Sequence, residues 1–224
     1  MAYRNEKRMN EISLKEAKKI KLFNRVEKKY VLIPSQLYDF YKYIESDWYI
    51  VKEENNFLFD YHSIYYDTID LDMYQEHRNN INNRQKLRIR EYSNGKKYLE
   101  IKTKTDGITN KIRKKITNED ISILQDWIKE NLHYNLSLEK ELDIKYKRTT
   151  FISKDKKERI TIDTEIKFYN YKTGLSKSID DIIVEIKHEQ DYPSLIELYF
   201  NTHNIQKQKF SKYYNGINYT LKES

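Results

Sequence analysis

The sequence contains no cysteine, only four glycines and two prolines, and no long apolar run. Without cysteine there are no disulfides, no thiol catalysis and no thiolate metal sites, which fits a reducing compartment. No stretch is apolar and long enough to span a bilayer, and no secretory signal opens the charged first residues. We therefore expect a soluble cytoplasmic protein.

Charge is plentiful but nearly balanced. The 224 residues include 42 lysines and arginines against 35 aspartates and glutamates, which gives a net charge of +7. This length suffices for one substantial domain with its own core. The modest positive excess suggests an anionic ligand, but it does not choose among phosphates, nucleic acid and a membrane surface. The position of the charges therefore matters more than their total.

The most informative stretch, residues 86–116, reads as three strands joined by two tight turns. Asn94-Gly95 and Asp106-Gly107 are turn signals between alternating segments. Because side chains alternate along a strand, one face is apolar and the other is cationic. An ordinary solvated face is one interpretation. A repeated row of cations also suits a polyanion, because like charges on neighbouring strands repel one another.

The rest of the chain predicts more strands and a few helices. Strands are expected at residues 25–33, 56–67, 141–153, 158–163, 167–171 and 180–187, and helices at 34–46, 69–77, from 117, and 191–203. Short connections and the absence of a parallel crossover pattern predict an α+β fold, with a closed antiparallel barrel of about eight strands and helices packed outside. We expect a basic helix or tail over residues 1–24 and a single domain over 25–224.

Common catalytic motifs are missing. There is no glycine-rich phosphate loop, no zinc-type histidine spacing and no nucleophile elbow, and no RNA-binding signature accompanies the tyrosines. Basic residues at period two remain, with Glu27, Glu100 and Glu185 on the same faces. Arginine and lysine hold phosphoryl oxygens and a carboxylate holds a divalent cation, so these are the parts of a phosphate site. An ion pair of Glu185 with a neighbouring lysine is an equally good interpretation.

A series of short pieces matches one known family in order and spacing. They are Lys29-Tyr30, Tyr65-Tyr66-Asp67-Thr68, Arg88-Ile89-Arg90, Glu100-Ile101-Lys102, Lys111-Ile112-Arg113, Arg148-Thr149-Thr150-Phe151, Arg159 with Asp163-Thr164-Glu165, Glu185-Ile186-Lys187 and Lys209-Phe210-Ser211-Lys212-Tyr213. By these pieces the chain from Arg25 to Gly216 resembles the VTC domain, the polyphosphate polymerase branch of the triphosphate tunnel metalloenzyme superfamily. Each piece is weak alone, but their joint order is specific.

The resemblance implies a short barrel forming a basic tunnel, and it assigns roles to particular residues. The implied catalytic residues are Lys29, Arg88, Arg90, Lys102, Lys111, Arg148, Arg159 and Lys212. The implied phosphate-binding residues are Lys187, Lys209, Ser211, Arg113 and Arg78, and Glu185 would coordinate Mn²⁺ or Mg²⁺. One departure concerns His77, which stands where the family has a phosphate-binding arginine. Either the histidine has replaced it, or Arg78 or Arg84 takes over.

The implied activity is that of an ATP-dependent polyphosphate polymerase, a transferase that moves the γ-phosphate of ATP onto a polyphosphate chain and releases ADP. One alternative is a triphosphatase that hydrolyses triphosphate or short polyphosphate in the same tunnel. Another is a non-catalytic polyphosphate sensor, against which the retention of Glu185 argues. Nucleic acid is not an expected partner. The oligomeric state and a membrane partner stay open, and the chain resembles a bare catalytic module.

Overall fold

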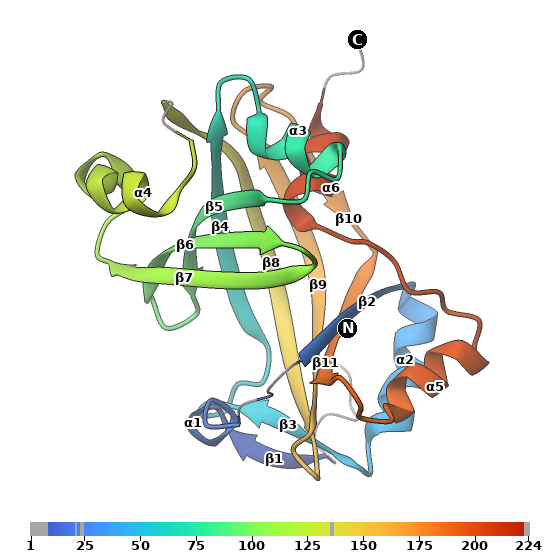
Figure 1. Ribbon diagram of the computed structural model, residues 1–224. Helices are drawn as coiled ribbons and strands as arrows, with labels where there is room; N and C mark the ends of the chain where they lie inside the picture. Colours follow the sequence, from blue (N-terminus) through green and yellow to red (C-terminus); the bar gives the residue numbers. More distant parts are fainter. Residues whose placement is uncertain (1–8, 21, 23–24, 135–136, 222–224) are drawn as a thin grey trace. The chain divides into compact units, whose positions relative to one another are not determined.

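The computed structural model describes residues 9–20, 22, 25–134 and 137–221 (Figure 1). The chain forms two compact units that interleave along the sequence. Unit 1 comprises Met1–Phe59, Lys147–Ile166 and Ile179–Phe210, and unit 2 comprises Asp60–Tyr146, Lys167–Ser178 and Ser211–Ser224. No helix within the described ranges has the length and apolar character that crossing a bilayer requires.

Unit 1 is a sheet segment with helices beside it. Its strands are β1 (Asn10–Ser13), β2 (Arg25–Leu32), β3 (Trp48–Lys52), β11 (Ile182–Glu189), the end of β8 (Leu138–Ser153) and the start of β9 (Glu158–Asn170). The hydrogen-bonded order is β2-β11-β9-β8-β3-β1. β11 runs antiparallel to β2 and β9, and β1 runs parallel to β3. The helices are α1 (Leu14–Ala17), α2 (Pro34–Ile44) and α5 (Leu195–Thr202).

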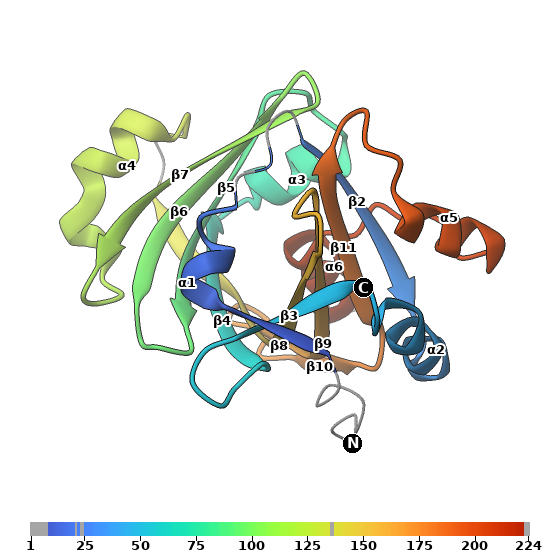
Figure 2. The same cartoon turned by 90° about the horizontal axis from the view of Figure 1, so that it is seen from below.

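The core of unit 1 forms where α2 and α5 meet the strands. Apolar residues of α2 recur at helical spacing and are buried, as the sequence predicted. Phe200 of α5 stacks on Tyr30 of β2 and on Phe40 of α2, with ring centroids 4.2 and 5.0 Å apart. Figure 2 shows α2 and α5 beside β2 and β11. This packing fixes β2 and β11, whose other residues carry the charges discussed below.

Unit 2 is built on a three-stranded meander. Its strands are β4 (Phe59–Thr68), β5 (Arg84–Tyr92), β6 (Lys97–Thr105), β7 (Ile108–Ile116), β10 (Ser176–Ile179), the start of β8 and the end of β9. The order is β8-β4-β5-β6-β7, and β10 pairs with β9. The helices are α3 (Asp72–Arg78), the 3₁₀ helix η2 (Ile121–Leu124), α4 (Gln125–Asn131) and α6 (Lys212–Thr220).

The predicted meander is confirmed, and its turns explain its register. Asp106 and Gly107 have φ of +50° and +81°, the left-handed pair that a two-residue hairpin turn needs. Gly95 has φ of +72° in the first turn. β5 and β6 are consequently paired over all but their last residues, and β6 and β7 along their whole lengths. Figure 1 shows the three strands side by side.

The expectation of a closed barrel of about eight strands is corrected in two respects. The sheet has eleven strands, and its hydrogen-bonded order ends at β2 on one side and at β7 on the other. Within the described ranges these end strands are not paired with each other. β7 is exposed along its length except at Ile116, and its four cations protect a free edge against further pairing. The mostly antiparallel sheet with several helices is as predicted.

Three local predictions also change. The two strands expected at residues 158–163 and 167–171 are one strand, β9, which contains Glu165 at φ +51°. The region expected to be a basic helix or tail contains β1 and the short α1, while residues 1–8, 21 and 23–24 lie outside the described part. The basic C-terminal motif leads into a helix, α6, which is not among the helices expected from the sequence. Its Gly216 packs against Leu142 and Phe168 so closely that a Cβ would lie 2.6 Å from both.

A buried carboxyl supports the start of α5. Ser194 caps α5 by accepting from the Glu197 amide at 3.1 Å, and its hydroxyl donates to Glu158. Glu158 is only 2% exposed, and burial raises its pKa from 4.5 to about 7. His188, beside it, bonds Glu197 at 2.7 Å. Between these two pKa values the folded chain holds a proton that the unfolded chain has lost.

We expect the free energy of unfolding to fall as the pH rises from about 4.5 to about 7, by up to roughly 3 kcal/mol from this one group. Glu158→Gln should abolish this contribution, because the amide is neutral and its oxygen still accepts from Ser194. Urea unfolding followed by tryptophan fluorescence at about pH 5 and about pH 8 measures the difference. Equal pH slopes for the variant and the parent would show that Glu158 titrates normally.

Candidate functional site

Unit 2 gathers cations around one buried carboxylate. The register of the meander places Arg88 opposite Glu100. The Nε and Nη2 of Arg88 donate to Glu100 Oε2 at 3.0 and 2.7 Å, and its Nη1 donates to the Tyr65 hydroxyl at 2.7 Å. Lys111 Nζ donates to the other Glu100 oxygen at 3.1 Å. We call Tyr65, Arg88, Arg90, Glu100 and Lys111 the Arg88 cluster.

The electrostatics of the Arg88 cluster favour an anion. Burial would raise the pKa of Glu100, but the charges of Arg88, Arg90 and Lys111 outweigh it and hold the pKa at about 2. Burial would likewise raise the pKa of Tyr65, yet Arg88 and Arg90 lower it. Three cations against one carboxylate leave two positive charges in excess. The cluster therefore satisfies its own carboxylate and retains attraction for a further anion.

The basic C-terminal motif contacts the same unit. The Ser211 hydroxyl caps α6 by accepting from the Tyr214 amide at 3.4 Å, and it also accepts from Lys86 Nζ at 2.8 Å. Lys212 Nζ lies 4.6 Å from the centroid of the Tyr146 ring. Lys86 and Tyr146 were not among the sequence-predicted site residues. The sequence could have indicated Lys86 as a site residue, because it lies two residues before Arg88 and therefore on the same cationic face.

Asp67 holds the C-terminal motif beside the Arg88 cluster through Tyr213. The Asp67 carboxylate accepts from the amides of Met73 and Tyr74 at 3.0 Å and from the Tyr213 hydroxyl. The Tyr213 ring stacks on Tyr65 with centroids 4.9 Å apart. Tyr65 in turn accepts from Arg88. The family-like Tyr-Tyr-Asp-Thr segment thus orients side chains rather than offering a carboxylate to a ligand.

Unit 1 holds a second cluster in which charges alternate. In the register of β2 and β11, Glu185 lies opposite Lys29, and Lys187 lies opposite Glu27. Lys29 Nζ lies 3.5 Å from Glu185 Oε2 and 3.6 Å from Glu27 Oε1. Lys187 Nζ donates to Glu185 Oε1 and lies 3.7 Å from Glu27 Oε2. We call these four residues the Glu185 cluster.

Glu185 is an anion held by its neighbours. Burial would raise its pKa, but Lys187, Lys29 and Arg148 lower it well below the usual 4.5. Arg148 itself makes a bidentate pair with Asp163, with N–O distances of 2.5 and 2.7 Å. Arg159 Nη2 donates to the Ala17 carbonyl at 2.9 Å. Two implied phosphate ligands are thus engaged with the protein itself.

The Glu185 cluster could hold a divalent cation only together with a bound phosphate. Within the described ranges no group of three or more histidine, cysteine, aspartate or glutamate side chains gathers into a metal cage. Mg²⁺ is commonly held by one or two carboxylates together with substrate phosphates. The ionised oxygens of Glu185, next to Glu27, match that donor set. A bound phosphate would have to complete the coordination.

The remaining predicted residues lie in varied surroundings. Lys102 lies between Lys86 and Lys111 in the meander register, and Arg113 stacks over the Tyr98 ring at 4.7 Å. Arg78 on α3 and Lys209 before α6 are exposed. At the departure from the family pattern, the His77 ring stacks on Tyr214 at 5.0 Å, while Arg84 Nη1 donates to the Ile81 carbonyl at 2.6 Å.

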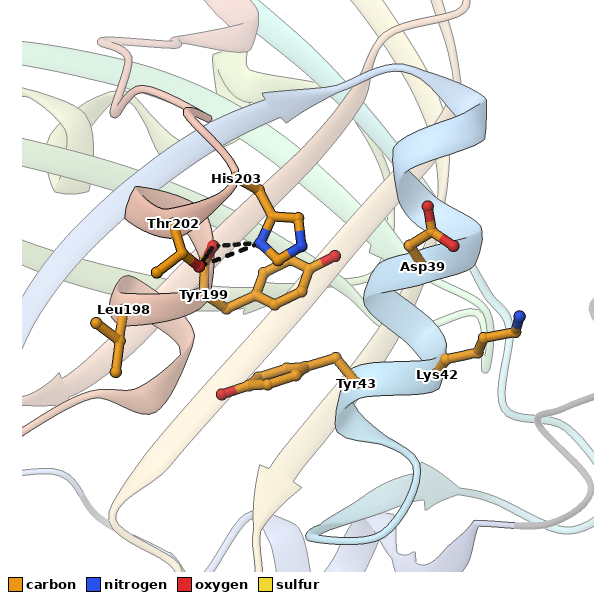
Figure 3. Close-up of a pocket in the computed structure, with 7 residues that line it drawn as sticks. All are labelled: Asp39, Lys42, Tyr43, Leu198, Tyr199, Thr202 and His203. Atoms are coloured by element: carbon orange, nitrogen blue, oxygen red, sulfur yellow. Dashed lines mark hydrogen bonds between the residues drawn. The ribbon is translucent and has the colours of Figure 1, made fainter.

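A hollow of about 500 Å³ lies between α2 and α5 of unit 1 (Figure 3). Its wall is aromatic, because Tyr43 lies against Tyr199 at 4.4 Å and Tyr199 stacks on His203 at 4.0 Å. The dashed lines in Figure 3 show His203 Nδ1 bonded to Thr202 Oγ1 and to the Tyr199 carbonyl. None of the sequence-predicted site residues lines it, and it bears no resemblance to a phosphate site.

Comparisons with known proteins identify the family. A model of the VTC domain matches residues 24–221. A proposed adenylate cyclase from Bacillus halodurans is 12% identical with a TM-score of 0.55, covering 88% of this chain and 98% of its own. HpAC1 from Hippeastrum, a proposed adenylyl cyclase described as having a dominant triphosphatase activity, is 16% identical with a TM-score of 0.50, covering 88% and 97%.

At these identities the two solved structures show likeness of fold alone. No curated protein matches the sequence. The family model spans most of the chain, including every basic strand described above. The chain therefore belongs to the VTC domain family.

Proposed function

We propose that the protein is a metal-dependent phosphotransferase that moves the γ-phosphate of ATP onto the end of a polyphosphate chain and releases ADP. The observation that carries the proposal is the Arg88 cluster, where three cations surround one carboxylate and leave positive charge in excess. Membership in the VTC domain family supports the choice of phosphate as the anion. The Glu185 cluster adds carboxylates that suit Mn²⁺ or Mg²⁺.

The residues would act by positioning and by charge stabilisation. A terminal phosphate oxygen of the acceptor is itself the nucleophile, so no protein general base is required. The planar guanidinium of Arg88 suits two-pronged contacts with phosphoryl oxygens, whereas Lys111 acts as a point charge. Glu100 and Tyr65 hold Arg88 in place before a ligand arrives. A bound divalent cation would supply further neutralisation of phosphate charge.

The Glu185 cluster would contribute separately. Lys29 and Lys187 each lie near both carboxylates of the cluster, so their ammonium groups are already oriented. If phosphate bound together with a cation, the two lysines would exchange their ion pairs with Glu27 and Glu185 for ion pairs with phosphate. Their side chains would need little reorganisation. Glu185 would hold the cation. Glu27 would offset the positive charge of the two lysines.

We expect purified protein incubated with ATP and MnCl₂ to produce a polyphosphate ladder on a stained polyacrylamide gel, with ADP and little free phosphate. A chelator should abolish the ladder, because the phosphate charge would no longer be neutralised. Free phosphate without a ladder would instead indicate a triphosphatase, the activity described for the Hippeastrum protein of similar fold. Tight polyphosphate binding without turnover would indicate a sensor.

A further inference from the structure

Thr161 is a buried hydroxyl on the face of the Glu185 cluster. It lies on β9 and is 6% exposed. In the antiparallel register its direct partner on β11 is Glu185, which is itself the partner of Lys29 on β2. Residues directly opposite on neighbouring strands project to the same face of the sheet. The row across the three strands is therefore a cation, a carboxylate and a hydroxyl.

The Thr161 hydroxyl has no hydrogen-bond partner within the described part of the protein. Two other buried threonines differ from it. Thr68 Oγ1 donates to Asp72 at 2.8 Å, and Thr220 Oγ1 donates to the Gly216 carbonyl at 2.7 Å. Native proteins leave few buried polar groups unpaired, because such groups lose water without compensation. Thr161 thus differs from Thr68 and Thr220, whose buried hydroxyls are paired.

The charged groups around Thr161 bond one another instead. Asp163 lies two residues further along the same face of β9, and both of its carboxylate oxygens accept hydrogen bonds from Arg148. Glu185 accepts from Lys187, and Lys29 lies 3.5 Å from its other oxygen. The hydroxyl therefore stands next to an ionised carboxylate without joining its hydrogen bonds. A partner brought by a ligand of Glu185 would satisfy it.

We propose that Thr161 is a positioning residue for a divalent cation at Glu185, with its hydroxyl accepting a hydrogen bond from a water molecule on that cation. The inference rests on the proposed function, because it takes the Glu185 carboxylate as the metal ligand. Mg²⁺ keeps several of its waters when proteins bind it, and those waters need acceptors. Groups that orient metal-bound ligands in this way commonly change metal affinity 10–100-fold.

The test is direct Mn²⁺ binding to the full chain with inorganic phosphate present, measured by titration calorimetry and by the paramagnetic resonance signal of free Mn²⁺. Thr161→Val keeps the branched shape and removes the hydroxyl, and it should weaken Mn²⁺ binding about 10-fold. Thr161→Ser keeps the hydroxyl and should bind Mn²⁺ like the parent. Thr164→Val, on the same strand with its side chain on the other face, is the matched control and should also bind normally.

A second readout separates this role from a structural one. Without metal, Thr161→Val should melt at the same temperature as the parent or higher, because a methyl group replaces an unpaired buried hydroxyl. A lower melting temperature would show that the fold itself satisfies the hydroxyl and would overturn the inference. So would unchanged Mn²⁺ affinity in Thr161→Val when the parent binds Mn²⁺. A parent that binds no Mn²⁺ would overturn the metal dependence of the proposed function as well.

Discussion

Replacing Arg88 with alanine is expected to lower the free energy of unfolding by about 3–5 kcal/mol at neutral pH, the typical cost of leaving one member of a buried ion pair alone. Glu100 is 1% exposed and receives two of its hydrogen bonds from Arg88. Without Arg88 its charge stays buried, with Lys111 as the remaining hydrogen-bonding cation. Urea unfolding followed by tryptophan fluorescence measures the loss.

Arg113→Ala is the matched control. Arg113 lies opposite Glu100 in the register of β6 and β7, but it is exposed and stacks over Tyr98. Its removal should cost no more than about 1 kcal/mol, as expected for an exposed cation on an aromatic ring. Equal losses in the two variants would contradict the assignment, because they would show that Glu100 does not depend on Arg88.

The cost of losing Arg88 should also depend on pH. In the parent, the pKa of Glu100 is lowered from 4.5 to about 2, so the pair stabilises the fold above about pH 4.5 and this contribution is lost as the pH falls through about 2. In Arg88→Ala the carboxyl protonates more readily. The variant should therefore recover stability relative to the parent in acid.

The second large effect is expected for Glu185→Gln, which should lower metal-dependent turnover by at least about 10²-fold. The amide keeps the shape of the side chain but has no charge with which to hold a divalent cation. The products of ATP and Mn²⁺ incubation, resolved as ADP, free phosphate and polyphosphate, give the measurement. Glu165→Gln is the control, since Glu165 is a surface residue whose ion pair with Lys147 is exposed.

Stability provides a second view of Glu185→Gln. The pKa of Glu185 is lowered, so its charge stabilises the fold above the unfolded value of 4.5, and this contribution is lost as the pH falls through the lower folded value. The variant should melt below the parent at neutral pH and approach it in acid, because Lys29 and Lys187 lose a shared partner. Normal turnover in a folded Glu185→Gln would contradict the metal assignment.

Much of the fold was accessible from the sequence by itself. Alternation of apolar and charged residues located β5, β6 and β7, and the Asn-Gly and Asp-Gly turns set their connections. The same alternation placed Arg88 and Glu100 on the cationic face. Ordered motifs identified the VTC domain family, which the family model confirms. These features depend on neighbours in sequence or on period two, so one chain is enough to predict them.

Only the tertiary structure decided that the sheet stays open and which charged side chains pair. Period two fixes the face of a residue but not its register, so it could not show that Glu100 is the internal anion of the cation row. It also left open whether Glu185 pairs with lysine, which Lys187 does. Thr161 became visible only because β9 lies beside β11 in a register that sets it opposite Glu185. Such contacts join residues far apart in the chain, and only packing and strand register decide them.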